Sequence, residues 1–138
     1  MPDFRLPRLD GSELSLEELR GRRVLVVFSD PHCGPCDVLA PQLEKFHCEH
    51  SEIAVVMISR REPKENTRKL KEHGLTFQVV LQQRWEISRV YAVFATPAAY
   101  LIDEAGIITQ DVAVGVEPIL ALMAKADSET NEVAMAVP

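Results

Sequence analysis

The sequence has few cysteines, no excess of positive charge and no long apolar run. Three cysteines among 138 residues are too few, and odd in number, for a small secreted fold built on disulfides. Fifteen basic residues against 21 acidic ones give a net charge of −6, without the basic face that nucleic acids or anionic membranes require. No apolar stretch approaches the length that crosses a bilayer. We therefore expect no nucleic-acid partner and no membrane contact by this segment.

The hydrophobic pattern predicts one α/β domain that is large enough to bury its own core. Continuous β-branched runs indicate strands buried on both faces, and apolar residues at helical spacing indicate helices between them. We expect strands at 23–30, 53–59 and 76–82, helices at 33–47, 63–74, 84–93 and 117–126, a capped turn of helix at 15–21, and a hairpin over 98–115 that turns at 104–106. The domain then covers 1–126, and 127–138 form a C-terminal tail that we expect to be flexible because it has no period.

Two of the cysteines, Cys33 and Cys36, stand where a buried strand gives way to a helix. The unpaired N–H groups of a helix N-terminus favour a thiolate and lower the pKa of the first cysteine. The second thiol lies one turn further into the helix, close enough for a disulfide and more sheltered. Pro35 suits a first helical turn because it has a fixed φ and no N–H group. This arrangement predicts a redox pair for thiol–disulfide exchange.

A metal site is the first alternative, because His47 and His50 complete a C-x2-C-x10-H-x2-H string. If one helix runs from Cys36 to His47, the two pairs stand roughly 16 Å apart at about 1.5 Å per residue. Zinc ligands must instead converge on one ion, so we expect no metal. A purely structural disulfide is also disfavoured, since a loop of two residues closes little chain entropy.

The segment VLVVFSDPHCGPCDVLAPQLEKF resembles the active-site strand and helix of thioredoxins, with Pro41 at the position of the family's helix-kinking proline. Further along the chain, FATPAAYLID resembles the family's Thr-Pro segment. The resemblance implies that Pro97 follows a cis peptide bond and faces the dithiol. Two such features at the right separation are far more specific than a lone C-x-x-C motif.

The N-terminal segment PDFRLPRLDGSELSLEELRGRRVLVVF resembles the extension shared by TlpA/ResA-type thioredoxins, methylamine-utilisation-type thiol proteins and peroxiredoxins, the AhpC/TSA-redoxin-like branch. The implied fold is a thioredoxin fold, a central mixed β-sheet flanked by helices, with an N-terminal extension and an extra α/β insertion. Such chains usually begin Ala-Pro-Asp-Phe after a leader or membrane anchor, and here Met1 precedes Pro-Asp-Phe. We expect an extracytoplasmic, periplasmic location if a leader was trimmed, and a cytoplasmic one otherwise.

The resemblance also implies a mechanism. Cys33 attacks a substrate disulfide, Cys36 resolves the mixed disulfide, and Pro97 supports this catalysis. The implied substrate-binding residues are His32, Gly34, Pro35 and Thr96. No cofactor beyond the Cys33–Cys36 disulfide is implied; the partners are disulfide-bearing proteins and an upstream thiol reductant, and the chain is expected to be monomeric. The Gly-Pro dipeptide indicates a reducing potential, nearer about −270 mV than about −120 mV.

Two positions depart from the family pattern. Many thioredoxins carry a buried acid six residues before the first cysteine, where this chain has Val27. ResA-type proteins carry a glutamate three residues after the second cysteine, where this chain has Leu39. Proton transfer then depends on water or on an acid that the sequence does not identify. For nearby Asp30 we expect simple solvation, with proton transfer as the alternative. His32 either tunes the pKa of Cys33 when charged or is an ordinary loop histidine.

Two other functions stay open. A peroxiredoxin-like peroxidase needs Pro-x-x-x-Thr/Ser-x-x-Cys, but the matching positions are Val26 and Asp30 for Cys33, and Ser29 and Cys33 for Cys36. Neither set fits. A non-catalytic binding module would not need an intact dithiol or Pro97.

The remaining residues have structural interpretations. We expect Cys48 to be a free, partly buried thiol. The charge runs at 60–64 and 69–72 are expected to be solvated surface, and the aromatic residues Trp85, Tyr91, Phe94 and Tyr100 are expected to pack in or near the core.

Overall fold

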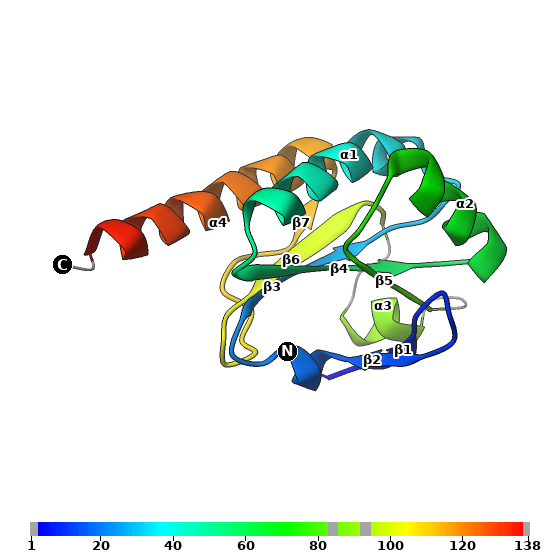
Figure 1. The fold of residues 1–138 in the computed structure, drawn as a ribbon, viewed down its shortest axis with the longest axis horizontal. Helices are drawn as coiled ribbons and strands as arrows, with labels where there is room; N and C mark the ends of the chain where they lie inside the picture. Colours follow the sequence, from blue (N-terminus) through cyan, green and yellow to red (C-terminus); the bar gives the residue numbers. More distant parts are fainter. Residues whose placement is uncertain (1–2, 83–85, 92–94, 137–138) are drawn as a thin grey trace.

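The computed structural model of the chain describes residues 3–82, 86–91 and 95–136 (Figure 1). Its centre is a five-stranded sheet in the order β5-β4-β3-β6-β7. β3 (Arg23–Phe28) pairs in parallel with β4 (Ile53–Ser59), which pairs in parallel with β5 (Gln78–Leu81). On its other side β3 pairs antiparallel with β6 (Ala98–Ile102), followed by β7 (Ala113–Val114). The predicted mixed sheet is confirmed.

Helices cover one face of the sheet, as Figure 1 shows, where α1 (Gly34–Glu49) and α4 (Val116–Ala136) lie side by side. The core on this face contains alternate strand residues such as Leu25 and Val55, packed against helix residues such as Leu43 and Ile119. α2 (Pro63–His73) follows β4 and ends at Gly74, whose left-handed backbone closes the helix as predicted.

The N-terminal segment and α3 (Glu86–Val90) cover the opposite face. β1 (Arg5–Pro7) and β2 (Glu13–Ser15) form a separate antiparallel pair, and the 3₁₀-helix η1 (Leu16–Leu19) follows. The other set of alternate strand residues, including Val26 and Ile58, packs against this layer. Two covered faces explain why β3 and β4 are apolar at nearly every position.

α4 is longer than the sequence pattern predicts. It continues to Ala136, whereas we expected the helix to end at Ala126 and an irregular tail to follow. The residues after Ala126 include no glycine, and no proline before Pro138, so nothing in the chain stops a helix that is already formed. Figure 1 shows the backbone of this part of α4 projecting beyond the sheet.

The predicted hairpin differs in part from the structure. After β6 the chain forms only an isolated bridge between Ile102 and Ile108 before β7, so the hairpin is more irregular than expected.

Among the aromatic residues, Tyr91 is buried as expected, and the Tyr100 hydroxyl donates to the Tyr91 carbonyl oxygen over 2.9 Å. Trp85 and Phe94, and part of the helix expected at 84–93, lie outside the described residues.

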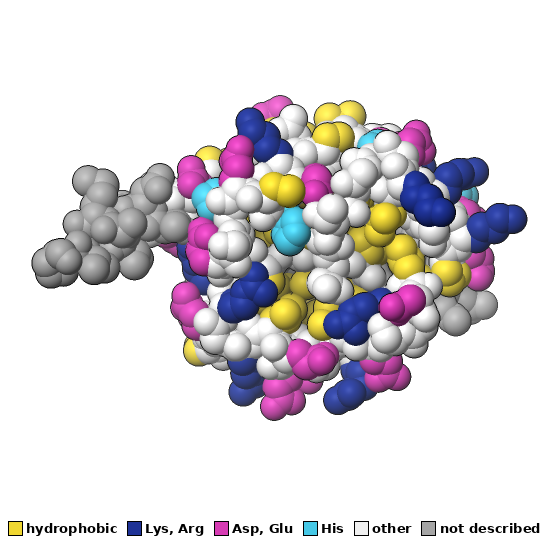
Figure 2. Space-filling model, viewed as in Figure 1, with side chains coloured by type: hydrophobic (Ala, Val, Ile, Leu, Met, Phe, Trp, Pro, Cys, Tyr) yellow, Lys and Arg dark blue, Asp and Glu magenta, His cyan; other side chains and the backbone are white. Residues whose placement is uncertain are grey.

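The surface carries charges of both signs and has no large basic face on the side drawn in Figure 2, as the composition predicts. On the face drawn in Figure 2, basic and acidic side chains are interspersed around a hollow with apolar side chains at its base. Within the described ranges, no helix has both the length and the apolar character needed to span a bilayer.

Candidate active site

The two cysteines form a disulfide at the start of α1, with Cα atoms 5.2 Å apart. β3 ends five residues before Cys33, which is the N-cap residue of α1, and Pro35 lies in the first turn of the helix. Cys33 is partly exposed, whereas Cys36 is only 5% exposed. The predicted asymmetry between an accessible and a sheltered sulfur is therefore present.

The helix N-terminus is directed at the outer sulfur. The backbone N–H of Cys36 donates to Cys33 Sγ, with a nitrogen–sulfur distance of 3.2 Å. In the reduced protein this donor and the helix dipole favour a thiolate on Cys33. Local geometry thus favours Cys33 as the attacking sulfur.

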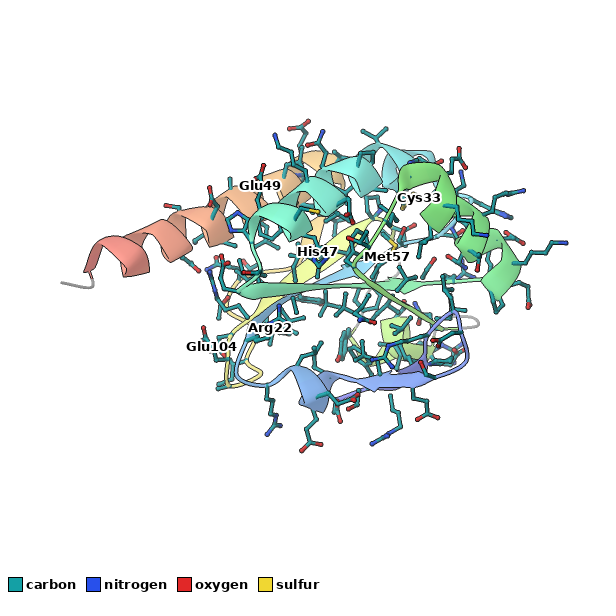
Figure 3. All side chains as sticks on the ribbon, viewed as in Figure 1. Arg22, Cys33, His47, Glu49, Met57 and Glu104 are labelled. Atoms are coloured by element: carbon teal, nitrogen blue, oxygen red, sulfur yellow. A yellow bond between two sulfur atoms is a disulfide. The ribbon has the colours of Figure 1, made fainter. Side chains whose placement is uncertain are left out.

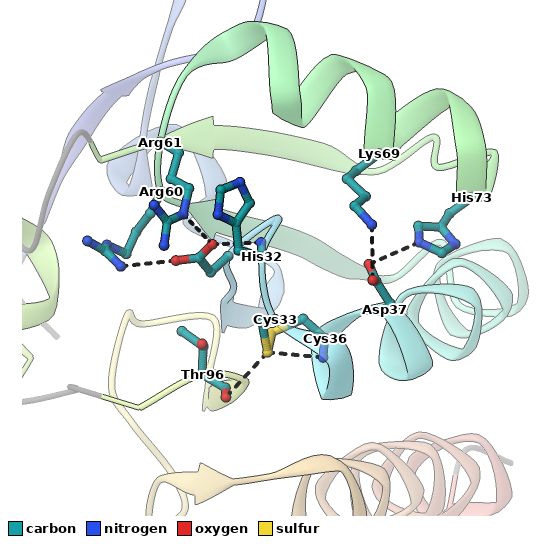
Figure 4. Close-up of a disulfide and its surroundings, with 10 residues drawn as sticks. His32, Cys33, Cys36, Asp37, Arg60, Arg61, Lys69, His73 and Thr96 are labelled. Atoms are coloured by element: carbon teal, nitrogen blue, oxygen red, sulfur yellow. Dashed lines mark hydrogen bonds and ion pairs between the residues drawn. A yellow bond between two sulfur atoms is a disulfide. The ribbon is translucent and has the colours of Figure 1, made fainter.

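The second predicted segment lies against the disulfide. The Thr96–Pro97 peptide bond is cis, as expected. Cys33 Sγ lies 3.6 Å from the carbonyl oxygen of Thr96, although 63 residues separate them in the chain (Figure 4). Pairing of β6 with β3 brings the two segments together. Gly34 and Pro35 are exposed beside Cys33, where a substrate chain has access to them.

Asp30 is a buried ion-pair centre, so the expectation of simple solvation was wrong. It is 7% exposed, and its carboxylate accepts from Arg60 Nη1 over 3.0 Å and from Arg61 Nε over 2.7 Å. The same carboxylate accepts from the His32 N–H, and the Asp30 carbonyl accepts from the Cys33 N–H. Burial opposes ionisation, but these hydrogen bonds outweigh it and hold the pKa of Asp30 below its ordinary value. Asp30 therefore fixes the loop that presents Cys33.

The His32 ring lies toward α2 and away from the disulfide (Figure 4). Its Nε2 contacts the carboxylate of Glu65, and half of the side chain is exposed. The backbone of His32 thus belongs to the loop held by Asp30. Its predicted effect on the pKa of Cys33 stays a prediction.

A second charged cluster lies on the other side of Cys36. Asp37 Oδ2 accepts from Lys69 Nζ over 3.0 Å, and Asp37 Oδ1 lies 3.3 Å from His73 Nε2. Burial opposes ionisation of Asp37, but the hydrogen bonds from Lys69 and His73 outweigh it and lower the pKa of the carboxyl. The prediction that the two charge runs are solvated is wrong for Arg60 and Lys69, which are largely covered and pair with Asp30 and Asp37. Arg61 also pairs with Asp30, but its side chain is 38% exposed.

Sequence reasoning missed the partners of these groups. Lys69 and His73 are four residues apart, so helical spacing does place them on one face of α2. Nothing in the sequence shows that this face meets Asp37. Val27 and Leu39, at the positions of the family's acids, are fully buried among apolar side chains. Neither position supplies a carboxylate to the dithiol.

The other titratable candidates lie away from the disulfide. α1 is one continuous helix, so Cys33 and His47 lie at opposite ends of it, as Figure 3 shows. His47 packs against the ring of Phe77. Among the described residues, no group of three His, Cys, Asp or Glu side chains is placed to hold a metal ion.

Cys48 is exposed, whereas we expected it to be partly buried. Its thiol donates to Glu44 over 3.2 Å, and this hydrogen bond raises the pKa of the thiol. Cys48 is therefore a poorer nucleophile than a free cysteine.

Comparison with known proteins supports a redox site. Residues 1–111 match the model of the AhpC/TSA family. The chain is 32% identical over 119 residues to the thioredoxin-like protein YneN of Bacillus subtilis (strain 168), covering 83% of this chain and 69% of that protein. It is 32% identical over 108 residues to the thiol-disulfide oxidoreductase ResA of Geobacillus thermodenitrificans (strain NG80-2). That match covers 76% of this chain and 62% of ResA, so the chain spans less than two thirds of that relative.

Solved structures show the same fold. A Chlorobium tepidum protein assigned as thiol:disulfide interchange protein DsbE superposes with a TM-score of 0.81 and 25% identity, over 91% of this chain and 92% of that chain. A secreted Mycobacterium tuberculosis disulfide oxidoreductase homologous to Escherichia coli DsbE gives a TM-score of 0.76 at 20% identity, over 88% and 95% of the two chains. The predicted thioredoxin fold is confirmed. The chain belongs to the AhpC/TSA family, and its cysteine pair on this fold makes it a thiol–disulfide oxidoreductase domain.

Proposed function

We propose that this domain reduces disulfides in partner proteins through Cys33 and Cys36. The observation that carries the proposal is the position of the Cys33 sulfur, which is accessible, receives a helix N–H, and lies against the Thr96 carbonyl with Cys36 sheltered behind it. An accessible first thiol and a protected second thiol are what thiol–disulfide exchange requires.

The reaction has two exchange steps. The Cys33 thiolate attacks one sulfur of the substrate disulfide, forming a mixed disulfide and releasing the other substrate sulfur as a thiolate. The Cys36 thiolate then attacks Cys33 Sγ, which forms the Cys33–Cys36 disulfide and releases the second substrate thiolate. Two electrons pass from the dithiol to the substrate, and the two released thiolates take up two protons.

We propose that the substrate chain lies over the exposed turn at Gly34 and Pro35 and along the Thr96–Pro97 segment, with His32 at its border. Gly34 and Pro35 are exposed and Thr96 is partly exposed, whereas Pro97 is buried, and the Thr96 carbonyl lies beside the attacking sulfur. The substrates are proteins that carry disulfides, no cofactor takes part beyond the cysteine pair, and the domain acts as a monomer. An upstream thiol reductant must return two electrons after each cycle.

The proposed location is extracytoplasmic. The resemblance of the N-terminal segment to TlpA/ResA-type proteins supports it, as does the similarity in fold to a secreted disulfide oxidoreductase. A disulfide substrate is also more abundant outside the cytosol, where thiols are not kept reduced.

Insulin-disulfide reduction with dithiothreitol as the electron source tests the proposed activity. We expect the wild-type protein to accelerate precipitation of the insulin B chain, Cys33→Ser to abolish the acceleration, and Cys48→Ser to keep it. An active Cys33→Ser variant contradicts the proposal. Hydrogen peroxide consumption separates the peroxidase alternative, because a dithiol reductase gives little turnover of peroxide.

A further inference from the structure

A small cavity lies behind the sheltered cysteine, between the first turn of α1, α2 and the sheet. Cys36, Asp37, Lys69 and His73 all line it, and its volume is about 30 Å³. A cavity of this volume can hold a water molecule, which needs roughly 10–15 Å³. Most of the lining is apolar, and Asp37, Lys69 and His73 are among its polar residues. Cys36 and two titratable residues of α2 therefore line the same cavity.

Cys36 needs a proton acceptor at this place. The resolving step, which belongs to the proposed function, requires Cys36 as a thiolate. Cys36 is only 5% exposed, so its proton has little direct access to bulk water. Neither Val27 nor Leu39 can accept it.

The groups around the cavity differ in their ability to take up a proton near neutral pH. Asp30 is committed to Arg60 and Arg61, and these partners hold its pKa low. Asp37 is likewise held as a carboxylate by its two partners on α2.

On α2, Lys69 is paired with Asp37 and also lies 4.0 Å from Glu72. The sheet contributes uncharged side chains to the cavity lining, including Met57, Ser59 and Val79. His73 is the remaining group there, and histidine is the side chain that ordinarily changes charge between about pH 5 and 8.

The contact between His73 and Asp37 leaves His73 able to accept a proton. With Asp37 ionised, His73 Nε2–H donates to Asp37 Oδ1, so the other ring nitrogen, Nδ1, carries the free lone pair. When the ring takes up a proton, the carboxylate stabilises the resulting positive charge. Only 18% of the His73 side chain is exposed, yet this suffices for the ring to return its proton to solvent.

We infer that His73 accepts the Cys36 proton through a water molecule in this cavity, and that Asp37 positions the ring. The Cys36 S–H gives its proton to the water, and the water gives one to His73. The Cys36 thiolate attacks Cys33 Sγ, and protonated His73 then releases its proton to solvent. Charge and protons balance, and α2 takes over the role that an acid on β3 or α1 has in relatives.

The test separates the two exchange steps with dithiobis-nitrobenzoate. In a Cys48→Ser background, attack by Cys33 releases one coloured thionitrobenzoate, and resolution by Cys36 releases a second. Stopped-flow absorbance records both phases between about pH 6 and 9. Wild type, His73→Gln and Asp37→Asn are compared with Glu72→Gln, which removes a neighbouring exposed carboxylate on the same helix.

We expect His73→Gln to slow the second phase about tenfold or more at neutral pH, to flatten its pH profile, and to leave the first phase unchanged. Asp37→Asn should give an intermediate second phase, and Glu72→Gln should match the background. An unchanged second phase in His73→Gln overturns the inference, and so does an equal slowing of both phases, which indicates a structural role. If the background protein itself releases no second thionitrobenzoate, it is the proposed function that fails.

Discussion

Asp30 Oδ1 lies 2.7 Å from Arg61 Nε, and this ion pair joins the ends of the two parallel strands β3 and β4 beneath the active-site loop. Arg60 holds the second carboxylate oxygen over 3.0 Å. The loop that carries Cys33 thus has its backbone tied to a buried charge, in addition to its covalent connection to β3.

Replacing Asp30 should destabilise the protein. Asp30→Ala leaves Arg60, whose side chain is 17% exposed, without this partner, and it also removes the acceptor for the His32 N–H. We expect a loss of about 2–3 kcal/mol in the free energy of unfolding, measured by urea denaturation. Asp111→Ala is the matched control at an exposed aspartate and should stay within about 0.5 kcal/mol of wild type. Equal effects of the two substitutions contradict the structural role of Asp30.

The same carboxylate should make stability depend on acid pH. The pKa of Asp30 is lower in the folded protein than in the unfolded chain, where it is about 3.9. The stabilisation is therefore complete above that value and is lost as the pH falls through it toward the folded pKa. Between about pH 5 and 3, the unfolding free energy should fall less steeply in Asp30→Asn than in wild type. Urea titrations at several pH values measure the slopes, and identical slopes contradict this prediction.

Prediction from sequence succeeded where the signal is local. The apolar runs of β3 and β4 identify strands covered on both faces, and the position of Cys33 between a strand and a helix fixes the redox motif. Gly74 ends α2 because a left-handed residue is needed there. Each of these features depends on neighbours within a few residues.

The approach of the Thr96–Pro97 segment to Cys33 was predicted through the family resemblance, but residue patterns alone failed to predict the distant ion-pair partners. Arg61 meets Asp30 across 31 residues, and His73 meets Asp37 across 36, so neither pair has a periodic signature. Without knowledge of its partner, a charged side chain is predicted to be solvated. The exposure of Cys48 depends in the same way on how the end of α1 packs, and no pattern in the chain reports that.

The length of α4 can be tested by truncation. Asp127 and Glu129 of α4 form ion pairs with the rest of the domain, His50–Asp127 and Arg23–Glu129. Deleting 130–138 should leave the unfolding free energy within about 0.5 kcal/mol of wild type, because it preserves both pairs. Deleting 127–138 removes both ion pairs and should lower the unfolding free energy by about 0.5–1 kcal/mol more, because each partly exposed ion pair contributes only a few tenths of a kcal/mol. Thermal or urea denaturation compares the two deletion variants. A larger loss of stability on deleting 130–138 than on deleting 127–138 contradicts the prediction.

The roles of the two cysteines can be distinguished by trapping. In a Cys48→Ser background, Cys36→Ser should accumulate a mixed disulfide between Cys33 and a disulfide-bearing protein, because no thiol remains to resolve it. Cys33→Ser should accumulate almost none, since Cys36 is buried. Non-reducing electrophoresis and intact mass report the adduct. Equal trapping by both variants contradicts the assignment of Cys33 as the attacking thiol.

The most direct measurement is the redox equilibrium of the Cys33–Cys36 pair in glutathione buffers, read by alkylation and intact mass. A reducing domain with a Gly-Pro dipeptide should show a midpoint near about −270 mV and lose two hydrogens on oxidation. A midpoint above about −180 mV contradicts the proposed direction and indicates an oxidase or isomerase. If the mass changes at no potential, the redox function itself is contradicted.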